Sequence, residues 1–155
     1  MQDESIAGIP ASIQAAWGRK ARPTKGPRPG LSLDRVVEAA VRLASSHSLD
    51  AVSMGRVASD LGVSTMSLYR YVGSKDELLE LMIDAVYAPV ASAPDSDAGW
   101  RARLSDWAWG NLRVLRKHGW VLRIPVHGYP MTPHQIGVME NGLSALGDTG
   151  LAERR

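Results

Sequence analysis

The sequence predicts an all-α protein, and three observations carry this prediction. Apolar residues recur every three or four positions in several stretches, which is the spacing of an amphipathic helix. Serine or threonine precedes these stretches, and glycine follows several of them, as expected at the starts and ends of helices. Almost no stretch alternates apolar and polar residues in the manner of a strand.

The composition narrows the class of protein. The chain has 155 residues, of which 45% are apolar, and this is enough to bury a sizeable core. Cysteine is absent, which excludes disulfide bonds, thiolate zinc sites and a cysteine nucleophile. No apolar run approaches the roughly 18 residues of a membrane span, and the acidic N-terminus lacks the apolar stretch of a signal peptide. We therefore expect a soluble cytoplasmic protein that makes no membrane contact.

Positive charge is concentrated in residues 1–30, which hold five basic residues against two acidic ones. Because the segment RKARPTKGPRPG is rich in proline and glycine and has no apolar period, residues 1–30 are predicted to form a flexible basic arm. Composition alone leaves two interpretations open, a solvated tail or an arm that binds the phosphate backbone or the minor groove of DNA. In the second interpretation the arm binds through Arg22, Lys25 and Arg28.

The first predicted helix begins after Ser32, which is placed to cap its N-terminus. We expect it to end near residues 45–48. One face of this helix is apolar and is formed by Leu33, Val36, Val37, Ala40 and Leu43.

Two short helices separated by a glycine-containing turn follow. The first starts after Ser53 and ends at Gly62, a residue suited to the left-handed conformation at a helix end. Ser64 caps the second, which we expect to reach about residue 71 or 72. These lengths are typical of a helix-turn-helix. With Leu68 and Val72 inside, the second helix presents hydroxyl groups, an arginine and two tyrosines, and such a surface suits phosphates and base edges of DNA.

A fourth helix is predicted after Ser74, because Ser74 and Glu77 have the spacing of a capping box. The prolines of segment 87–97 are expected to close this helix and to begin a linker. Beyond the linker, a helix is expected over residues 100–118 and a short one over 120–127, broken by Pro125. The last helix starts with Thr132 and Pro133, runs to Gly147 or Gly150, and carries an apolar face formed by Ile136, Met139, Leu143 and Leu146.

The run AVSMGRVASDLGVSTMSLYRYVGSKDELLELMIDAV closely resembles the N-terminal DNA-binding domain of TetR-type transcriptional regulators, and LGVSTMSLYRYVGSKDELL is its most specific part. The segments WRARLSDWAW and LRKHGWVLRIPVHG resemble the tetracycline-repressor-like C-terminal regulatory domain. The chain is thereby identified as a member of the TetR family in that branch. The resemblance implies a helix-turn-helix DNA-binding domain over residues 31–76 and a helical ligand-binding and dimerisation domain over residues 77–155.

The function implied by the resemblance is that of a homodimeric repressor, which binds a palindromic operator in double-stranded DNA and is released by a small-molecule effector. Ser53 and Lys75 are then expected to bind phosphate. The second helix of the helix-turn-helix, the recognition helix, is expected to contact DNA through Thr65, Met66, Ser67, Tyr69, Arg70 and Tyr71. Two departures from the family pattern limit which DNA contacts can be assigned to this chain. Gly55 stands where many relatives carry arginine, and Arg70 occupies a position that varies among relatives, so the base preference cannot be taken from the family.

The effector pocket has candidates in the second half of the chain, namely Trp107, Asn111, Trp120, His127, Met131 and Met139. Ordinary core packing is the alternative for each of them, because aromatic and methionine side chains at helical spacing usually just pack. Asn111 is the stronger signal, since a buried amide needs a hydrogen-bond partner, although a neighbouring backbone carbonyl could supply one.

Other classes of protein account for less of the sequence. The histidines lie in no metal-binding spacing, and there is no GxSxG, phosphate-binding glycine loop or dinucleotide fingerprint. We therefore expect no enzyme, no metal and no cofactor. A helical interaction module without DNA function would explain the apolar helices but not the turn spacing or the basic arm.

Regulators of this family usually continue with two long helices that form the dimer interface, so the domain at residues 77–155 is expected to be incomplete. A truncated regulator without specific DNA binding is the corresponding alternative. The other possibility is dimerisation through a different surface, such as the one near Trp109.

Overall fold

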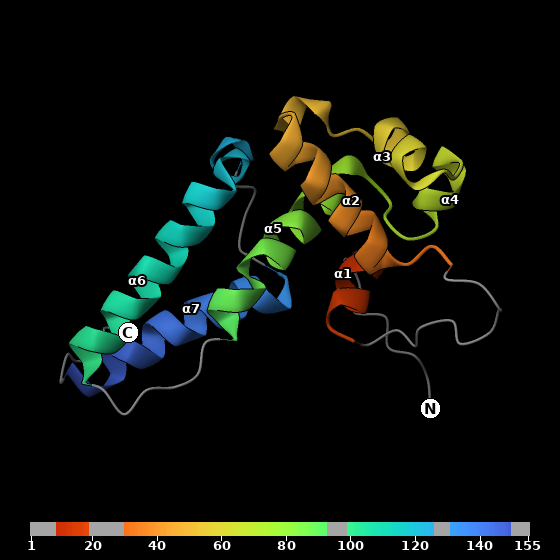
Figure 1. The fold of residues 1–155 in the computed structure, drawn as a ribbon. Coiled ribbons are helices and arrows are strands. Elements are labelled where there is room, and N and C mark those ends of the chain that lie inside the picture. The colour runs from red at the N-terminus through yellow and green to blue at the C-terminus, as the bar shows by residue number, and fades with distance from the viewer. Residues whose placement is uncertain (1–8, 19–29, 93–98, 126–130, 150–155) are drawn as a thin grey trace, which may run out of the picture. The chain divides into compact units, whose positions relative to one another are not determined.

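The computed structural model describes residues 9–18, 30–92, 99–125 and 131–149, and these residues form helices and no strand (Figure 1). The chain divides into two compact units, residues 1–82 and 83–155. The expected boundary lies six residues earlier, between residues 76 and 77. No helix among the described residues is long and apolar enough to cross a membrane.

The first unit contains five α-helices or parts of them. They are α1 (Ala11–Ala16), α2 (Leu33–Ser46), α3 (Met54–Leu61), α4 (Thr65–Tyr69) and the first half of α5 (Lys75–Ala91), with a short 3-10 turn, η1 (Leu49–Ala51), after α2. Apolar side chains from α2 to α5 meet in one core, whose largest fully buried members are Val36, Val52, Val57, Leu68, Val72, Leu78 and Met82. The predicted helices of this unit are confirmed.

Helices α2 to α5 each start with the serine cap that the sequence predicts. Ser32 accepts a hydrogen bond from the backbone N–H of Arg35, at 3.2 Å, and Glu77 donates its backbone N–H to Ser74, at 3.1 Å. Such caps satisfy backbone donors that have no partner inside the helix. The sequence analysis does not predict α1, which falls within the residues 1–30 that it assigns to a flexible arm.

The second unit contains the end of α5, then α6 (Trp100–Lys117), η2 (Gly119–Arg123), α7 (Pro133–Leu146) and η3 (Gly147–Thr149). Helices α6 and α7 pack against each other (Figure 1). The expected apolar face of α7 is wrong, because Met139, Leu143 and Leu146 are exposed. Instead, α7 buries Val138 together with two small residues, Gly142 and Ala145. The small side is needed because the indole of Trp107 of α6 lies against Gly142.

The expectation that prolines close the helix over residues 87–97 is also wrong. Helix α5 continues through Pro89 to Ala91. Proline removes one backbone donor, but the last carbonyls of the helix gain a partner from elsewhere: the side-chain amide of Asn141 donates to Val90, at 3.1 Å, and to Ala91, at 3.0 Å. Burial of Val90 and this cap together offset the lost bond.

Candidate DNA-binding surface

The turn between α3 and α4 is fixed by the backbone itself. Gly62 adopts φ 66° and ψ 32°, the left-handed conformation that glycine tolerates best. The N–H of Val63 donates to the carbonyl of Ala58, at 3.0 Å, and the N–H of Gly62 donates to that of Ser59, at 3.1 Å. This pair of bonds is a Schellman motif, which ends α3 and redirects the chain within two residues.

Helix α4 begins immediately after this turn. The hydroxyl of Ser64 accepts the backbone N–H of Ser67, at 3.3 Å, and lies 2.9 Å from the hydroxyl of Ser67. Leu68 is fully buried, and it anchors the helix to the core. The sequence analysis extends this helix to residue 71 or 72, but it ends at Tyr69 and a tight turn continues to Val72, whose N–H donates to Leu68.

The outer face of α4 carries most of the predicted DNA contacts. Met66 is 74% exposed and Tyr69 is 46% exposed. Arg70 is also exposed, whereas Thr65 and Ser67 are half-buried at the edge of the face. An apolar side chain, a phenol, hydroxyl groups and a guanidinium therefore share one surface, and this combination can contact thymine methyl groups, base edges and phosphates.

Tyr71 differs from the other predicted contacts. Its hydroxyl donates to the backbone carbonyl of Leu31, at 2.8 Å, and the side chain is half-buried. The phenol therefore joins the end of α4 to the residue that precedes the cap of α2. Sequence reasoning missed this contact, because the two residues are separated by forty positions.

Two predicted phosphate contacts lie at the starts of helices. Ser53 is exposed and accepts the N–H of Arg56 at 3.2 Å, which leaves its hydroxyl hydrogen available to a phosphate oxygen. Lys75 is exposed at the first position of α5. Arg56 is a further exposed cation in the first turn of α3, one position after Gly55. Arg56 is not among the contacts that the family resemblance implies, although its place after the cap of a helix-turn-helix indicates such a contact.

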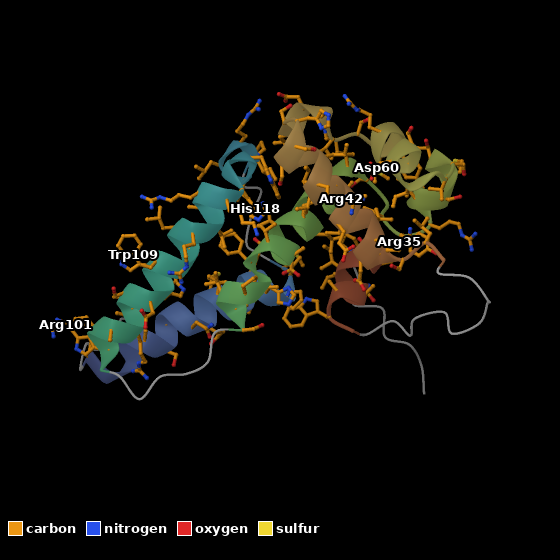
Figure 2. The ribbon with its side chains drawn as sticks, in the orientation of Figure 1. Arg35, Arg42, Asp60, Arg101, Trp109 and His118 are labelled. Atoms are coloured by element: carbon orange, nitrogen blue, oxygen red, sulfur yellow. The ribbon has the colours of Figure 1, made fainter. Side chains whose placement is uncertain are left out.

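An ion pair joins two helices of this unit. Arg42 of α2 and Asp60 of α3 approach to 2.9 Å, and Figure 2 labels both side chains. Both are well exposed, so the pair contributes little, in the range of about 0–1 kcal/mol. The basic residues Arg22, Lys25 and Arg28 lie outside the described residues.

The six pocket candidates have different surroundings in the second unit. Trp107 donates its indole N–H to the carbonyl of Val138, at 2.7 Å, and Asn111 donates its amide to the carbonyl of Trp107, at 2.8 Å. The backbone partner that the sequence analysis left open for Asn111 is therefore present. Trp120 is buried.

The two methionine candidates are less enclosed than Trp120. Met131 and Met139 are exposed, and His127 lies outside the described residues. His118 stands edge-on to the indole of Trp120, at 5.9 Å between ring centroids. Burial and, to a lesser degree, the charge of Lys117 lower the pKa of His118.

Sequence reasoning missed a buried carboxylate in the second unit. Asp84 of α5 is 5% exposed and accepts the backbone N–H groups of His134, at 2.8 Å, and Gln135, at 3.3 Å. Its second oxygen lies 2.8 Å from Nδ1 of His134. These N–H groups belong to the first turn of α7, so Asp84 caps that helix from another helix. Among the described residues, no three metal-ligating side chains are gathered in one place.

Comparison with known proteins places both halves of the chain. Residues 36–82 match the family model described as bacterial regulatory proteins, tetR family, and residues 93–155 match the tetracyclin repressor-like C-terminal domain. The chain is similar to the HTH-type transcriptional repressor DrrR1 of Streptomyces coeruleorubidus, with 42% identity over 146 residues that cover 94% of this chain and 54% of that protein.

Solved structures give the same result. Apo ActR from Streptomyces coelicolor superposes with a TM-score of 0.73 and 30% identity, covering 81% of this chain and 60% of that one. ActR in complex with actinorhodin superposes with a TM-score of 0.72, at the same identity and coverage. The chain matches DrrR1 over nearly all of its own length but spans only about half of that protein, 54%.

Proposed function

Because the chain belongs to the TetR family of bacterial regulatory proteins, we propose that it is a sequence-specific DNA-binding regulator that represses transcription. The observation that carries the proposal is the helix-turn-helix of α3 and α4, which ends in an exposed face built from Met66, Tyr69 and Arg70. The 42% identical relative DrrR1 is itself a transcriptional repressor, so catalysis forms no part of the proposal.

In the proposed complex, α4 lies in the major groove. Tyr69 and Arg70 contact base edges or phosphates, and the exposed thioether of Met66 contacts apolar base edges. Ser53 and Lys75 bind phosphates on either side of the groove, because they lie at the N-terminal ends of α3 and α5. Two copies related by a twofold axis would read a palindromic operator, one half-site each.

The second unit is proposed to bind a small-molecule effector that releases the DNA. The complex of ActR with actinorhodin supports this part, as does the concentration of aromatic side chains around α6 and η2. Actinorhodin is therefore the first probe. Titration into the DNA complex is expected to lower fluorescence anisotropy of the DNA and to quench tryptophan fluorescence together. Actinorhodin that changes neither signal at saturating concentration would contradict this effector class.

The DNA-binding proposal is tested by fluorescence anisotropy with a labelled fragment from upstream of the gene, against excess nonspecific competitor. Sedimentation of the same sample reports the number of chains bound. Competitor-resistant binding of two chains per site is expected. Lys75→Ala should weaken binding about tenfold and lower the salt slope by about one, and Tyr69→Ala should weaken it without changing the slope.

Lys117→Ala is the matched control, because it removes an exposed lysine from α6 of the second unit. Circular dichroism should show the same helix content in all three variants. If Lys75→Ala and Tyr69→Ala both bind with wild-type affinity, α4 and the start of α5 are not the docking face. Binding that competitor DNA abolishes would favour the alternative of a truncated regulator without specific DNA binding. No binding even at low salt would favour the interaction-module alternative.

A further inference from the structure

Helix α1 lies outside the residues that match the DNA-binding family model, which begins at residue 36. It has only six residues, too few to be stable alone in water. Ser12 and Ile13 are nonetheless 3% and 2% exposed. Docking of this face onto the first unit must therefore supply the stability of α1, and the buried hydroxyl of Ser12 requires a partner there.

That partner is Glu77, in the first turn of α5. The hydroxyl of Ser12 donates to the Glu77 carboxylate, which also accepts the backbone N–H of Gly73, at 3.0 Å. The backbone N–H of Glu77 in turn donates to Ser74. The carboxylate thus holds the turn that joins α4 to α5, and α1 holds the carboxylate.

A second contact holds the same segment after α4. The Tyr71 hydroxyl donates to the carbonyl of Leu31, which precedes the cap of α2. The C-terminal end of α4 is therefore connected to the chain before α2 at two places, Tyr71 and the turn held by Glu77. Helix α4 itself has five residues and anchors only Leu68 in the core. Its orientation consequently depends on these tertiary contacts more than on its own helical bonds.

We propose that α1 is a brace for the recognition helix and that Ser12 is a positioning residue for DNA binding, acting through Glu77 on the turn after α4. Ser12 touches no DNA in this proposal. Its hydrogen bond keeps the Glu77 carboxylate in place to hold Gly73, and this fixes the direction in which α4 leaves the core. A contact surface needs to be held to within about 0.5 Å by such supporting bonds. The inference rests on the proposed function, since it assigns α1 to the same docking face.

The test compares Ser12→Ala with Ser12→Thr, which keeps the hydroxyl, in the full chain. Ser105→Ala, an exposed serine of α6, is the matched control. Specific affinity is measured by anisotropy with the upstream fragment, and nonspecific affinity with a scrambled fragment of equal length. We expect Ser12→Ala to lower specific affinity by about threefold to tenfold. Nonspecific affinity and the salt slope should stay at wild-type values, because no charge is removed.

Amide hydrogen exchange measured without DNA tests the effect of Ser12 on the turn after α4 independently of DNA binding. Ser12→Ala should increase the exchange rate of the amide of Gly73, and Ser12→Thr should restore the wild-type rate. In a Glu77→Ala background, Ser12→Ala should have no further effect on either exchange or affinity. Unchanged exchange at Gly73, or unchanged specific affinity when exchange is faster, overturns the brace. Wild-type protein that shows no specific binding overturns the proposed function instead, whatever the exchange data show.

Discussion

Replacement of Asp84 by alanine should destabilise the second unit strongly. The carboxylate is 5% exposed and accepts two backbone N–H groups from the first turn of α7. Thr132 holds the N-cap position of α7, but its side chain makes no cap bond and instead accepts the side-chain amide of Gln135, at 2.7 Å. Asp84 therefore performs the capping that Thr132 does not.

The expected magnitude follows from these contacts. Loss of an N-cap side chain costs about 0.5–2 kcal/mol, and a partly buried donor left without a partner costs about 1–3 kcal/mol. The ring of His134 contributes less, because 39% of its side chain is exposed and water can replace the carboxylate. Asp84→Ala should therefore lower the free energy of unfolding by about 2–4 kcal/mol. Asp84→Asn keeps one carbonyl oxygen and should cost about 1 kcal/mol.

Urea unfolding followed by tryptophan fluorescence measures the effect, because Trp100, Trp107, Trp109 and Trp120 all belong to the second unit. With a slope near 2 kcal/mol per molar urea, Asp84→Ala should move the midpoint by about 1–2 M. Asp106→Ala, an exposed carboxylate of α6, is the control and should change stability by less than about 0.5 kcal/mol. An Asp84→Ala midpoint within error of the Asp106→Ala midpoint would refute the capping argument.

Three further predictions concern packing and DNA contacts. Gly142→Ala should destabilise the second unit by about 1–2 kcal/mol in urea unfolding, because its Cβ would stand 3.0 Å from the indole of Trp107. The Cβ of Gly55→Ala would meet nothing within 4 Å, so this substitution should stabilise α3 by up to about 1 kcal/mol. Changes of the same sign in the free energy of unfolding for both variants would refute the argument. Replacing operator thymines by deoxyuridine should weaken wild-type binding but not that of Met66→Ala, if Met66 packs on a thymine methyl group; an equal loss in both proteins would exclude this contact. Deleting residues 1–28, which also removes α1, should lower affinity and flatten its salt dependence, and an identical slope would show that Arg22, Lys25 and Arg28 bind no phosphate.

The helix-turn-helix could be predicted because its determinants are local. Ser53, Gly62 and Ser64 act within three or four residues of their own positions, as caps or as a left-handed turn. Spacing in the sequence therefore corresponds directly to a hydrogen bond in the structure. The burial of Leu68 and Val72 follows in the same way from helical periodicity.

The features that could not be predicted depend on residues far apart in the chain. Asp84 meets the start of α7 across a separation of fifty residues, and Asn141 satisfies the end of α5 across a similar distance. Local rules placed the end of α5 at its prolines because they contain no information about a cap supplied by another helix. Helix α1 is similar: six residues with one apolar anchor, Ile13, have no detectable period, and only docking makes them helical.

The Asn141 cap has a consequence for protein engineering. Since the last carbonyls of α5 are satisfied by a side chain of α7, the end of this helix does not depend on the residues that come directly after it. The start of α6 is likewise set by its own backbone bonds to Gly99. The span between Ser92 and Gly99 is therefore a suitable place to insert a fluorescent reporter domain or a protease site, with both flanking helices expected to keep their present boundaries.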